Sequence, residues 1–243
     1  MTGRKQLRVS RRLDMIDDRI VKIRAGPEGT AKEFSVHEAI LRESSPFFRT
    51  ALDKKWREGR SRRIDLPQDD GEVVAAFLDW SYFKIIASRP VSPPELPMDD
   101  GEFDFLARLY CFAEKVLVPS FADDVIDAMA LKTDDVAKDG TRTFPSHSAI
   151  TLLYTGTPSG SPARRFVCDM YCEFGISAWI PKESGLNHPE FLQDLVRAAL
   201  GDHPRRSTNK HSNYPRRRKW HKCGPAEEFL QLAPLGERAG EAS

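Results

Sequence analysis

Residues 34–52, FSVHEAILRESSPFFRTAL, decide how the first half of the chain folds. Phe34 and Val36 alternate with polar residues, which is typical of a half-buried strand. Apolar residues then recur at helical spacing, at Ala39, Ile40, Phe47, Phe48, Ala51 and Leu52. The break at residues 44–46, Ser-Ser-Pro, divides this helical part, because serine caps a helix and proline suits its first turn. The stretch therefore predicts a strand and two short helices, and it contains no phosphate loop, metal cage or nucleophile motif.

Shorter patterns on both sides of this stretch predict the rest of a small sheet. Residues 18–23 are a β-branched run, and the turn cluster at 26–29 folds residues 32–36 back against it as a hairpin. Residues 64–66 alternate like a third strand, which a proline ends. Residues 54–63, between the second helix and this strand, are highly charged, and we expect them to form an exposed connection.

Helical spacing dominates the chain after residue 72, behind a predicted cap at residues 69–71. The first helix has a stripe of Val74, Phe77, Leu78 and Tyr82, with Trp80 beside it, and Ile85 and Ile86 extend it toward a proline-rich loop at 90–97. Further helices are predicted over 105–117, 119–131, 150–154, 166–174 and 191–200. We expect an α+β domain over residues 17–132 and a helical extension over 144–200. Residues 1–16 and 201–243 are basic and poor in apolar residues, which predicts disorder.

The composition excludes some classes of partner for the chain as a whole. The 243 residues include 37 basic and 36 acidic ones, so no overall field attracts nucleic acid or a membrane. No apolar run approaches the roughly 20 residues that span a bilayer. Four cysteines without an apolar signal core favour free thiols in a reducing compartment. We therefore expect an intracellular protein, in the nucleus or cytoplasm, that does not bind membranes.

The basic tail contains a cluster of cations beside an aromatic residue. Arg216, Arg217, Arg218 and Lys219 precede Trp220. Such a cluster can be a solvated tail, a nuclear localisation signal or a contact to nucleic acid, and charge runs are most often simply solvated. Nucleic-acid binding is the least favoured alternative, because no predicted fold surrounds the aromatic residues of the tail to form a groove. The spacing of a zinc finger, which a DNA-binding regulator would use, is also absent.

His37 and the cysteines are the residues that most resemble catalytic or metal-binding groups. His37 has no serine or cysteine companion that it could activate, so we predict a structural histidine that bonds backbone at the strand-to-helix corner. Cys168 and Cys172 are four residues apart, and His221 and Cys223 follow downstream, but the spacing matches no common zinc module. We predict free thiols, no catalytic site, no metal site and no cofactor.

The order of strand, Val-His, short helix, Ser-Pro-Phe-Phe and helix resembles the BTB/POZ domain, in particular that of fungal BTB proteins. The resemblance covers residues 17–132, and residues 144–200 resemble the helical extension of fungal members. The residues that carry it most directly are Val36, His37, Ser45, Pro46, Phe47 and Tyr82. The chain departs from the family after Tyr82, where Phe83-Lys84 replaces a small turn such as Thr-Gly.

The resemblance implies a BTB/POZ fold, in which a small three-stranded mixed sheet packs on a helical cluster and an α-helical extension follows. It also implies a non-enzymatic protein-protein interaction module without a cofactor, acting as a homodimer and docking partners. Family members dimerise through the first helix and the N-terminal strand, which gives a candidate interface of Ile20, Val21, Ala39, Leu41 and Phe48. Of these, Leu41 and Phe48 are expected at the surface rather than in the core.

Two further functions remain as alternatives. The first is a substrate adaptor for a cullin-type ubiquitin ligase, which would use the face around the third helix and the loops at 54–63 and 83–89. The usual substrate-reading domains of such adaptors do not fit into residues 133–243. The second is a nuclear regulator that contacts nucleic acid through the basic tail.

Overall fold

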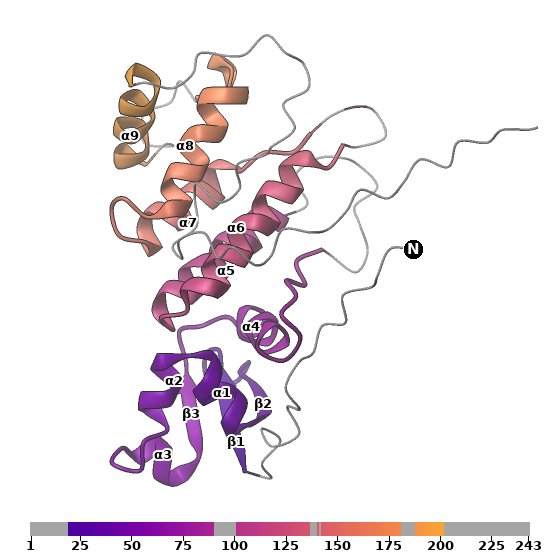
Figure 1. Ribbon diagram of the computed structural model, residues 1–243, viewed down its shortest axis with the longest axis vertical. Coiled ribbons are helices and arrows are strands. Elements are labelled where there is room, and N and C mark those ends of the chain that lie inside the picture. The colour runs from indigo at the N-terminus through magenta and orange to yellow at the C-terminus, as the bar shows by residue number, and fades with distance from the viewer. Residues whose placement is uncertain (1–18, 90–100, 137–139, 141, 181–187, 202–243) are drawn as a thin grey trace, which may run out of the picture.

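The computed structural model describes residues 19–89, 101–136, 140, 142–180 and 188–201. Its N-terminal part combines a small sheet with short helices, and longer helices follow (Figure 1). The sheet lies at one end of the molecule, α7, α8 and α9 lie at the other, and α5 and α6 run between them. The predicted disordered segments, residues 1–16 and 201–243, lie outside the described residues except for Gly201.

The sheet has three strands, β1 (Ile20–Ala25), β2 (Lys32–His37) and β3 (Arg63–Leu66), in the order β2-β1-β3. β1 pairs antiparallel with β2 and parallel with β3. Successive side chains of each strand point to opposite faces of the sheet, and one of these faces is buried. Its residues are Val21, Ile23, Ala25, Val36, Ile64 and Leu66. The predicted small mixed sheet is therefore confirmed.

Three short helices lie between β2 and β3, namely α1 (Glu38–Ser44), α2 (Pro46–Ala51) and α3 (Arg57–Ser61). The first two confirm the prediction from residues 34–52. The third was predicted only as an exposed connection. It packs closely on the end of α2, because a Cβ at Gly59 would overlap the carbonyl group of Asp53. Arg62, in the left-handed region at φ 52°, ends this helix.

Helix α4 (Gly71–Phe83) packs against the sheet, α1 and α5. The side chain of Asp70 caps it by accepting a hydrogen bond from the backbone N–H of Glu72 at 2.8 Å, as the sequence predicts. Trp80, which the sequence places beside the main stripe of this helix, is also in the core. Trp80 is buried against Phe121, because α4 has packing partners on more than one side.

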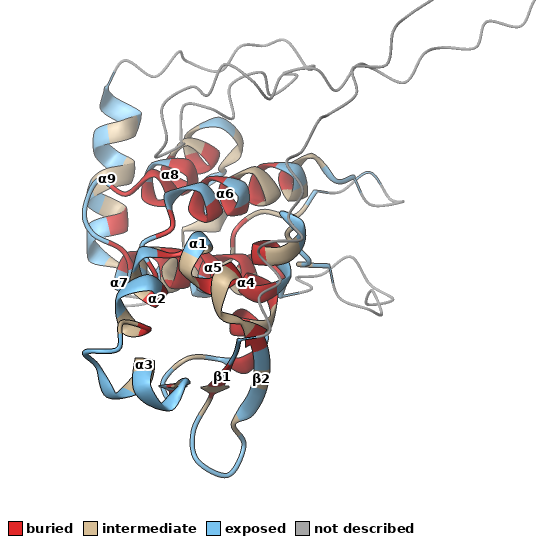
Figure 2. Cartoon of the chain, turned by 60° about the horizontal axis from the view of Figure 1, so that its bottom comes forward, coloured by how far each residue is buried: buried red, intermediate tan, exposed pale blue. Residues whose placement is uncertain are grey.

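The remaining helices are α5 (Glu102–Lys115), α6 (Pro119–Asp134), α7 (His147–Gly156), α8 (Pro162–Phe174), the 3-10 helix η2 (Ser177–Trp179) and α9 (Pro189–Leu200). α5 contacts α4, α6 and α7, so it joins the N-terminal part to the helical extension. One continuous set of buried apolar residues runs from the sheet into α9 (Figure 2). Every helix predicted after residue 72 is present, with different ends.

Candidate functional site

The corner between β2 and α1 is held by His37 and Tyr82, which are 45 residues apart in the sequence. The Tyr82 hydroxyl oxygen accepts a hydrogen bond from the backbone N–H of His37 at 3.1 Å and lies 2.8 Å from its Nδ1. With the hydroxyl oxygen accepting from the backbone, the hydroxyl proton is free to be donated to Nδ1. His37 is therefore structural, as predicted, but its ring bonds a tyrosine hydroxyl and not a backbone group.

Ser45 connects the break between α1 and α2 to the turn between α5 and α6. Its Oγ accepts a hydrogen bond from the Phe48 N–H at 3.2 Å, which caps α2, and donates one to the Val116 carbonyl at 2.7 Å. Pro46 occupies the first turn of α2, where no donor is lost. Ser45 itself is fully buried. The predicted serine-proline cap is confirmed, and it also carries a contact to α5 that the sequence did not indicate.

Three of the five residues predicted for a dimer interface are in the core. Val21, Leu41 and Phe48 are each 0% exposed within a single chain. Val21 lies on the inner face of the sheet. The Phe48 ring stacks on the ring of Phe77 in α4, with 5.7 Å between the ring centres. The expectation that Leu41 and Phe48 lie at the surface is therefore wrong, because α4 covers the face of α1 and α2 that carries them.

Ile20 and Ala39 are the members of that predicted interface that solvent can reach. Ile20 is 39% exposed, and Ala39 is half-buried. Their neighbours meet directly, because the Glu38 N–H donates a hydrogen bond to the Arg19 carbonyl at 2.9 Å. The start of β1 and the start of α1 therefore form one accessible surface.

Other large apolar side chains are exposed on the N-terminal part, and sequence reasoning missed them as a group. Trp56 precedes α3, Phe83 ends α4, and Ile85 follows it. Leu117 is exposed in the turn between α5 and α6, in the left-handed region at φ 58°. Exposed apolar residues that the core does not use are candidates for contact with partners.

The structure explains how the chain accommodates Phe83-Lys84 after Tyr82. Lys84 adopts φ 56° and ψ 39°, the left-handed conformation that glycine adopts most readily, and it ends α4. Its Nζ lies 3.6 Å from the centre of the Trp80 ring, a cation-π contact that offsets part of the backbone cost. Consequently Ile85 and Ile86 do not extend the helix, contrary to the prediction.

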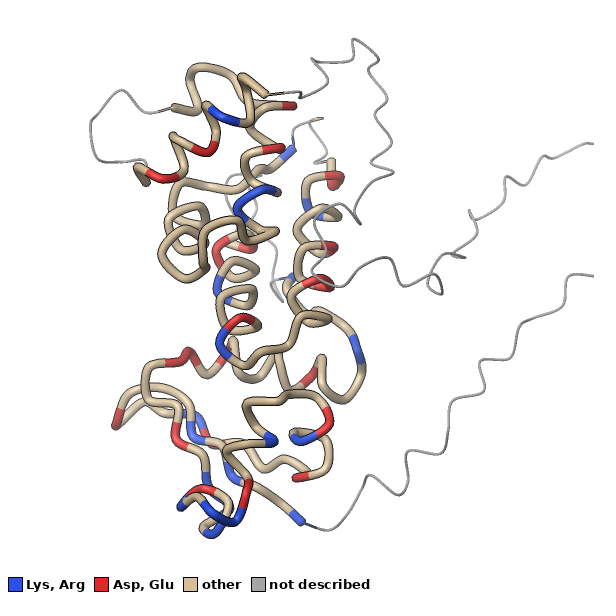
Figure 3. Tube along the Cα trace, turned by 60° about the vertical axis from the view of Figure 1, so that its left-hand side comes forward, with Lys and Arg blue, Asp and Glu red and all other residues tan. Residues whose placement is uncertain are grey.

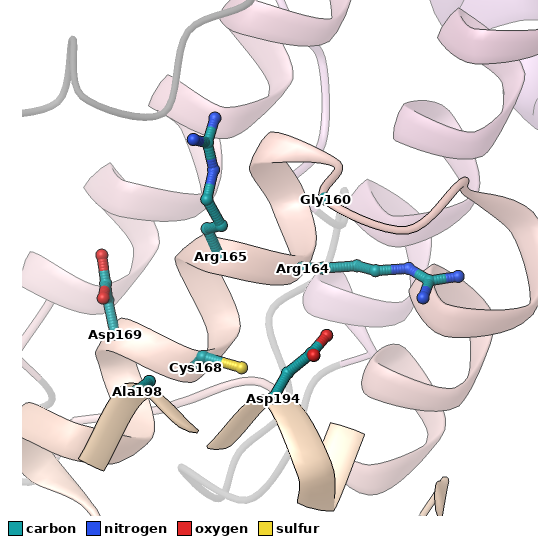
Figure 4. Close-up of a pocket in the computed structure, with 7 residues that line it drawn as sticks. All are labelled: Gly160, Arg164, Arg165, Cys168, Asp169, Asp194 and Ala198. Atoms are coloured by element: carbon teal, nitrogen blue, oxygen red, sulfur yellow. The ribbon is translucent and has the colours of Figure 1, made fainter. Parts of the chain in front are cut away.

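A cleft of about 460 Å³ in the helical extension is lined by residues of α8, α9 and the turn before α8 (Figure 4). Its lining residues are Gly160, Arg164, Arg165, Cys168, Asp169, Asp194 and Ala198. Arg164 is buried and donates to Thr157 Oγ1 at 3.1 Å and to the Tyr154 carbonyl at 2.6 Å, besides pairing with Glu190. This guanidinium therefore holds the turn between α7 and α8 and is not available to bind an anion.

The cysteines of α8 are poorly suited to nucleophilic or metal chemistry. Burial raises the pKa of the Cys168 thiol to about 12, and it also raises the pKa of Cys172. Because the thiolate is the reactive form, these groups stay protonated near neutral pH. Among the described residues, no three potential metal ligands gather at one place. His221 and Cys223, the downstream half of the hypothetical zinc set, lie outside the described residues.

Two other sequence predictions concern the tail and the membrane. Residues 216–219, the basic cluster, lie outside the described residues, so its role stays a prediction. Within the described ranges, none of the helices has both the length and the apolar character needed to span a bilayer.

Comparison with known families identifies the N-terminal part. Residues 19–92 match the family model of the BTB/POZ domain, a range that begins just before β1 and extends past α4. The match therefore includes the whole sheet, the corner at His37 and the Ser45 cap. A search of curated proteins returned no match. The similarity to fungal members in particular stays a prediction.

Proposed function

We propose, from the premise that residues 19–92 form a BTB/POZ domain, that this protein acts by self-association and by docking partner proteins. BTB/POZ domains are protein-interaction modules, so the match itself is the observation that carries the proposal. The chemistry of the described residues favours binding over catalysis, since His37 is engaged by Tyr82 and burial raises the pKa of Cys168.

The surface proposed for self-association is the one that contains Ile20 and Ala39. Ile20 is the apolar residue on the otherwise polar outer face of β1, and Ala39 lies next to it at the start of α1. β2 is also an edge strand, with β1 on one side only. A symmetric contact here would bury about 800 Å² on each partner, the size of a standard interface.

Light scattering after size-exclusion chromatography tests self-association directly. At tens of micromolar, the full chain is expected at twice the mass of one chain. The double variant Ile20→Glu, Ala39→Glu is expected to shift toward monomer, because it places charge on both copies of a symmetric contact. The matched control is Ile176→Glu, an exposed isoleucine in the helical extension. A wild-type protein that remains monomeric at these concentrations would remove self-association from the proposal.

A second candidate function is a substrate adaptor for a cullin-type ubiquitin ligase. Exposed Phe83, at 67%, and exposed Ile85 favour it, because both lie in the loop expected to face a cullin. In a pull-down with a purified cullin scaffold, the wild type should bind the scaffold, and a Phe83→Ala, Ile85→Ala double variant should not. Ile176→Ala serves as the exposed control.

The basic tail supports a third, separate proposal that concerns localisation. Arg216, Arg217, Arg218 and Lys219 form a cluster suited to nuclear import or to nucleic acid, and without that function the protein would be expected in the cytoplasm. Fluorescence microscopy that compares the full chain with a chain lacking residues 202–243 tests whether the tail directs the protein to the nucleus. Unchanged distribution after truncation would contradict a localisation role.

A further inference from the structure

We propose that the surface around α3 binds an acidic segment of a partner protein that carries one apolar or aromatic residue among its carboxylates. The α3 surface consists of Lys54, Lys55, Trp56, Arg57, Arg60 and Arg62, all of which are exposed. It is distinct from the surface at Ile20 and Ala39, and it includes most of the loop 54–63 that the adaptor alternative would use. The inference rests on the proposed docking of partner proteins and is tested separately from self-association.

The first observation is a concentration of positive charge that the fold does not neutralise. Residues 54–63 include six basic residues and one acidic residue, in a chain whose charges otherwise nearly cancel. Lys54, Lys55, Arg60 and Arg62 have no ion-pair partner among the described residues. Arg57 has only a loose pair with Glu58, at 3.8 Å and largely in solvent. Figure 3 shows several basic stretches at this end of the molecule, with acidic residues among them.

The α3 surface adjoins the outer face of the sheet, where basic side chains are paired with acidic ones. The Lys22 N–H donates to the Arg62 carbonyl at 2.9 Å, so the end of α3 adjoins β1. A hydrogen bond and the charge from Lys22 lower the pKa of Glu33, and the charges of Arg63 and Arg24 lower it further. Lys22 already pairs with Glu33 at 2.7 Å and Arg63 with Asp65 at 3.1 Å. These cations have carboxylate partners among the described residues, unlike Lys54, Lys55, Arg60 and Arg62 of the α3 surface.

The second observation is Trp56, which the core does not use. Its side chain is 56% exposed, and no described aromatic ring stacks on it. By contrast, Trp80 is buried and Trp179 contacts Phe144 and Tyr171. Tryptophan and arginine are the residues most enriched at the energetic centres of interfaces. A large exposed indole among cations therefore offers an apolar anchor within a basic surface.

The turn that carries Trp56 is held in place by the backbone. The Trp56 N–H donates to the Asp53 carbonyl at 2.9 Å, and the Trp56 carbonyl accepts from the Arg60 N–H at 3.2 Å. Gly59 allows close packing on Asp53, as described above. Because the backbone is ordered by these contacts, less conformational entropy is lost when a partner binds.

Charge and aromaticity together are compatible with phosphates as well as carboxylates, but the arrangement favours a peptide. Proteins that bind single-stranded nucleic acid generally use successive aromatic side chains on which consecutive bases stack. The α3 surface offers one aromatic residue, Trp56, surrounded by cations. One apolar anchor inside a ring of positive charge is complementary to one apolar residue flanked by acidic ones.

Fluorescence anisotropy on the full-length protein tests this inference. The probe is a fluorescein-labelled peptide of glutamates with one central phenylalanine, in low-salt buffer. Binding is expected, and it should weaken as salt shortens the range of exposed charges. Lys54→Gln with Lys55→Gln should lower the affinity about fivefold, since each exposed ion pair contributes modestly. Trp56→Ala should lower it at least as much, through loss of the apolar anchor.

Two matched variants and a second probe make the outcome decisive. Arg165→Gln removes an exposed cation from α8, and Ile176→Ala removes an exposed apolar side chain outside the α3 surface. Both should bind the peptide like the wild type. The inference is overturned if the wild type does not bind the peptide, if Arg165→Gln weakens binding as much as the lysine variant, or if oligothymidine binds more tightly than the peptide. Light scattering on the same variants should show the wild-type oligomeric state, which separates this result from self-association.

Discussion

Replacing Ser45 by alanine should destabilise the protein more than a surface serine would. The Oγ of Ser45 makes two hydrogen bonds inside a fully buried site, to the Phe48 N–H and to the Val116 carbonyl. Losing a helix N-cap costs about 1 kcal/mol, and leaving a buried carbonyl without its partner costs about 1–3 kcal/mol, so the expected loss is about 2–4 kcal/mol. This is a large part of the roughly 5–15 kcal/mol that stabilises a domain.

Urea denaturation followed by circular dichroism measures this loss. Ser45→Ala should lower the midpoint without changing the slope, because the surface exposed on unfolding stays the same. Ser44→Ala is the matched control, since the neighbouring serine has no hydrogen bond through its side chain to another described residue. It should change the free energy of unfolding by less than about 0.5 kcal/mol. Equal effects of the two substitutions would show that the buried Ser45 contacts do not stabilise the fold.

Three further results are expected. Tyr82→Phe removes the hydroxyl that bonds His37, so thermal unfolding should show a loss of about 1–2 kcal/mol, and an unchanged midpoint would contradict the role of this pair. Gly59→Ala drives a methyl group into the Asp53 carbonyl, so α3 must shift; urea denaturation should show a loss of about 1–3 kcal/mol, and no loss would mean that the turn is not tightly packed. Burial raises the pKa of Cys168 from its ordinary value of 9.0 to about 12, so the thiol stays protonated in the folded state while it ionises in the unfolded state. The resulting stability is present below pH 9 and is lost as pH rises toward 12, and a Cys168→Ala variant should show a weaker decline over that range.

Features that depend on residues close in sequence were predicted well. The hairpin follows from a turn cluster between a β-branched run and an alternating strand, and the start of α2 follows from Ser45 beside Pro46. The Asp70 cap on α4 is of the same kind. In each case the hydrogen bond or the turn geometry involves residues a few positions apart, so the local sequence contains the information needed.

Features that depend on which faces meet were predicted poorly. Periodicity placed Leu41 and Phe48 on short helices, but it did not show that α4 would cover them. The partnership of His37 with Tyr82 joins residues far apart in the chain, so neither residue indicated the other.

Local patterns of apolar, capping and turn residues by themselves indicated the three strands and every α-helix except α3. The resemblance of the N-terminal part to the BTB/POZ domain added that the small sheet is mixed. Only the tertiary structure decided which apolar residues are available to a partner. Trp80 and Trp56 illustrate the difference, since each has a polar residue on either side in the sequence. Trp80 of α4 is buried against Phe121 of α6, whereas the turn before α3 leaves Trp56 in solvent. Burial depends on the packing of distant segments, and a single local pattern does not contain that information.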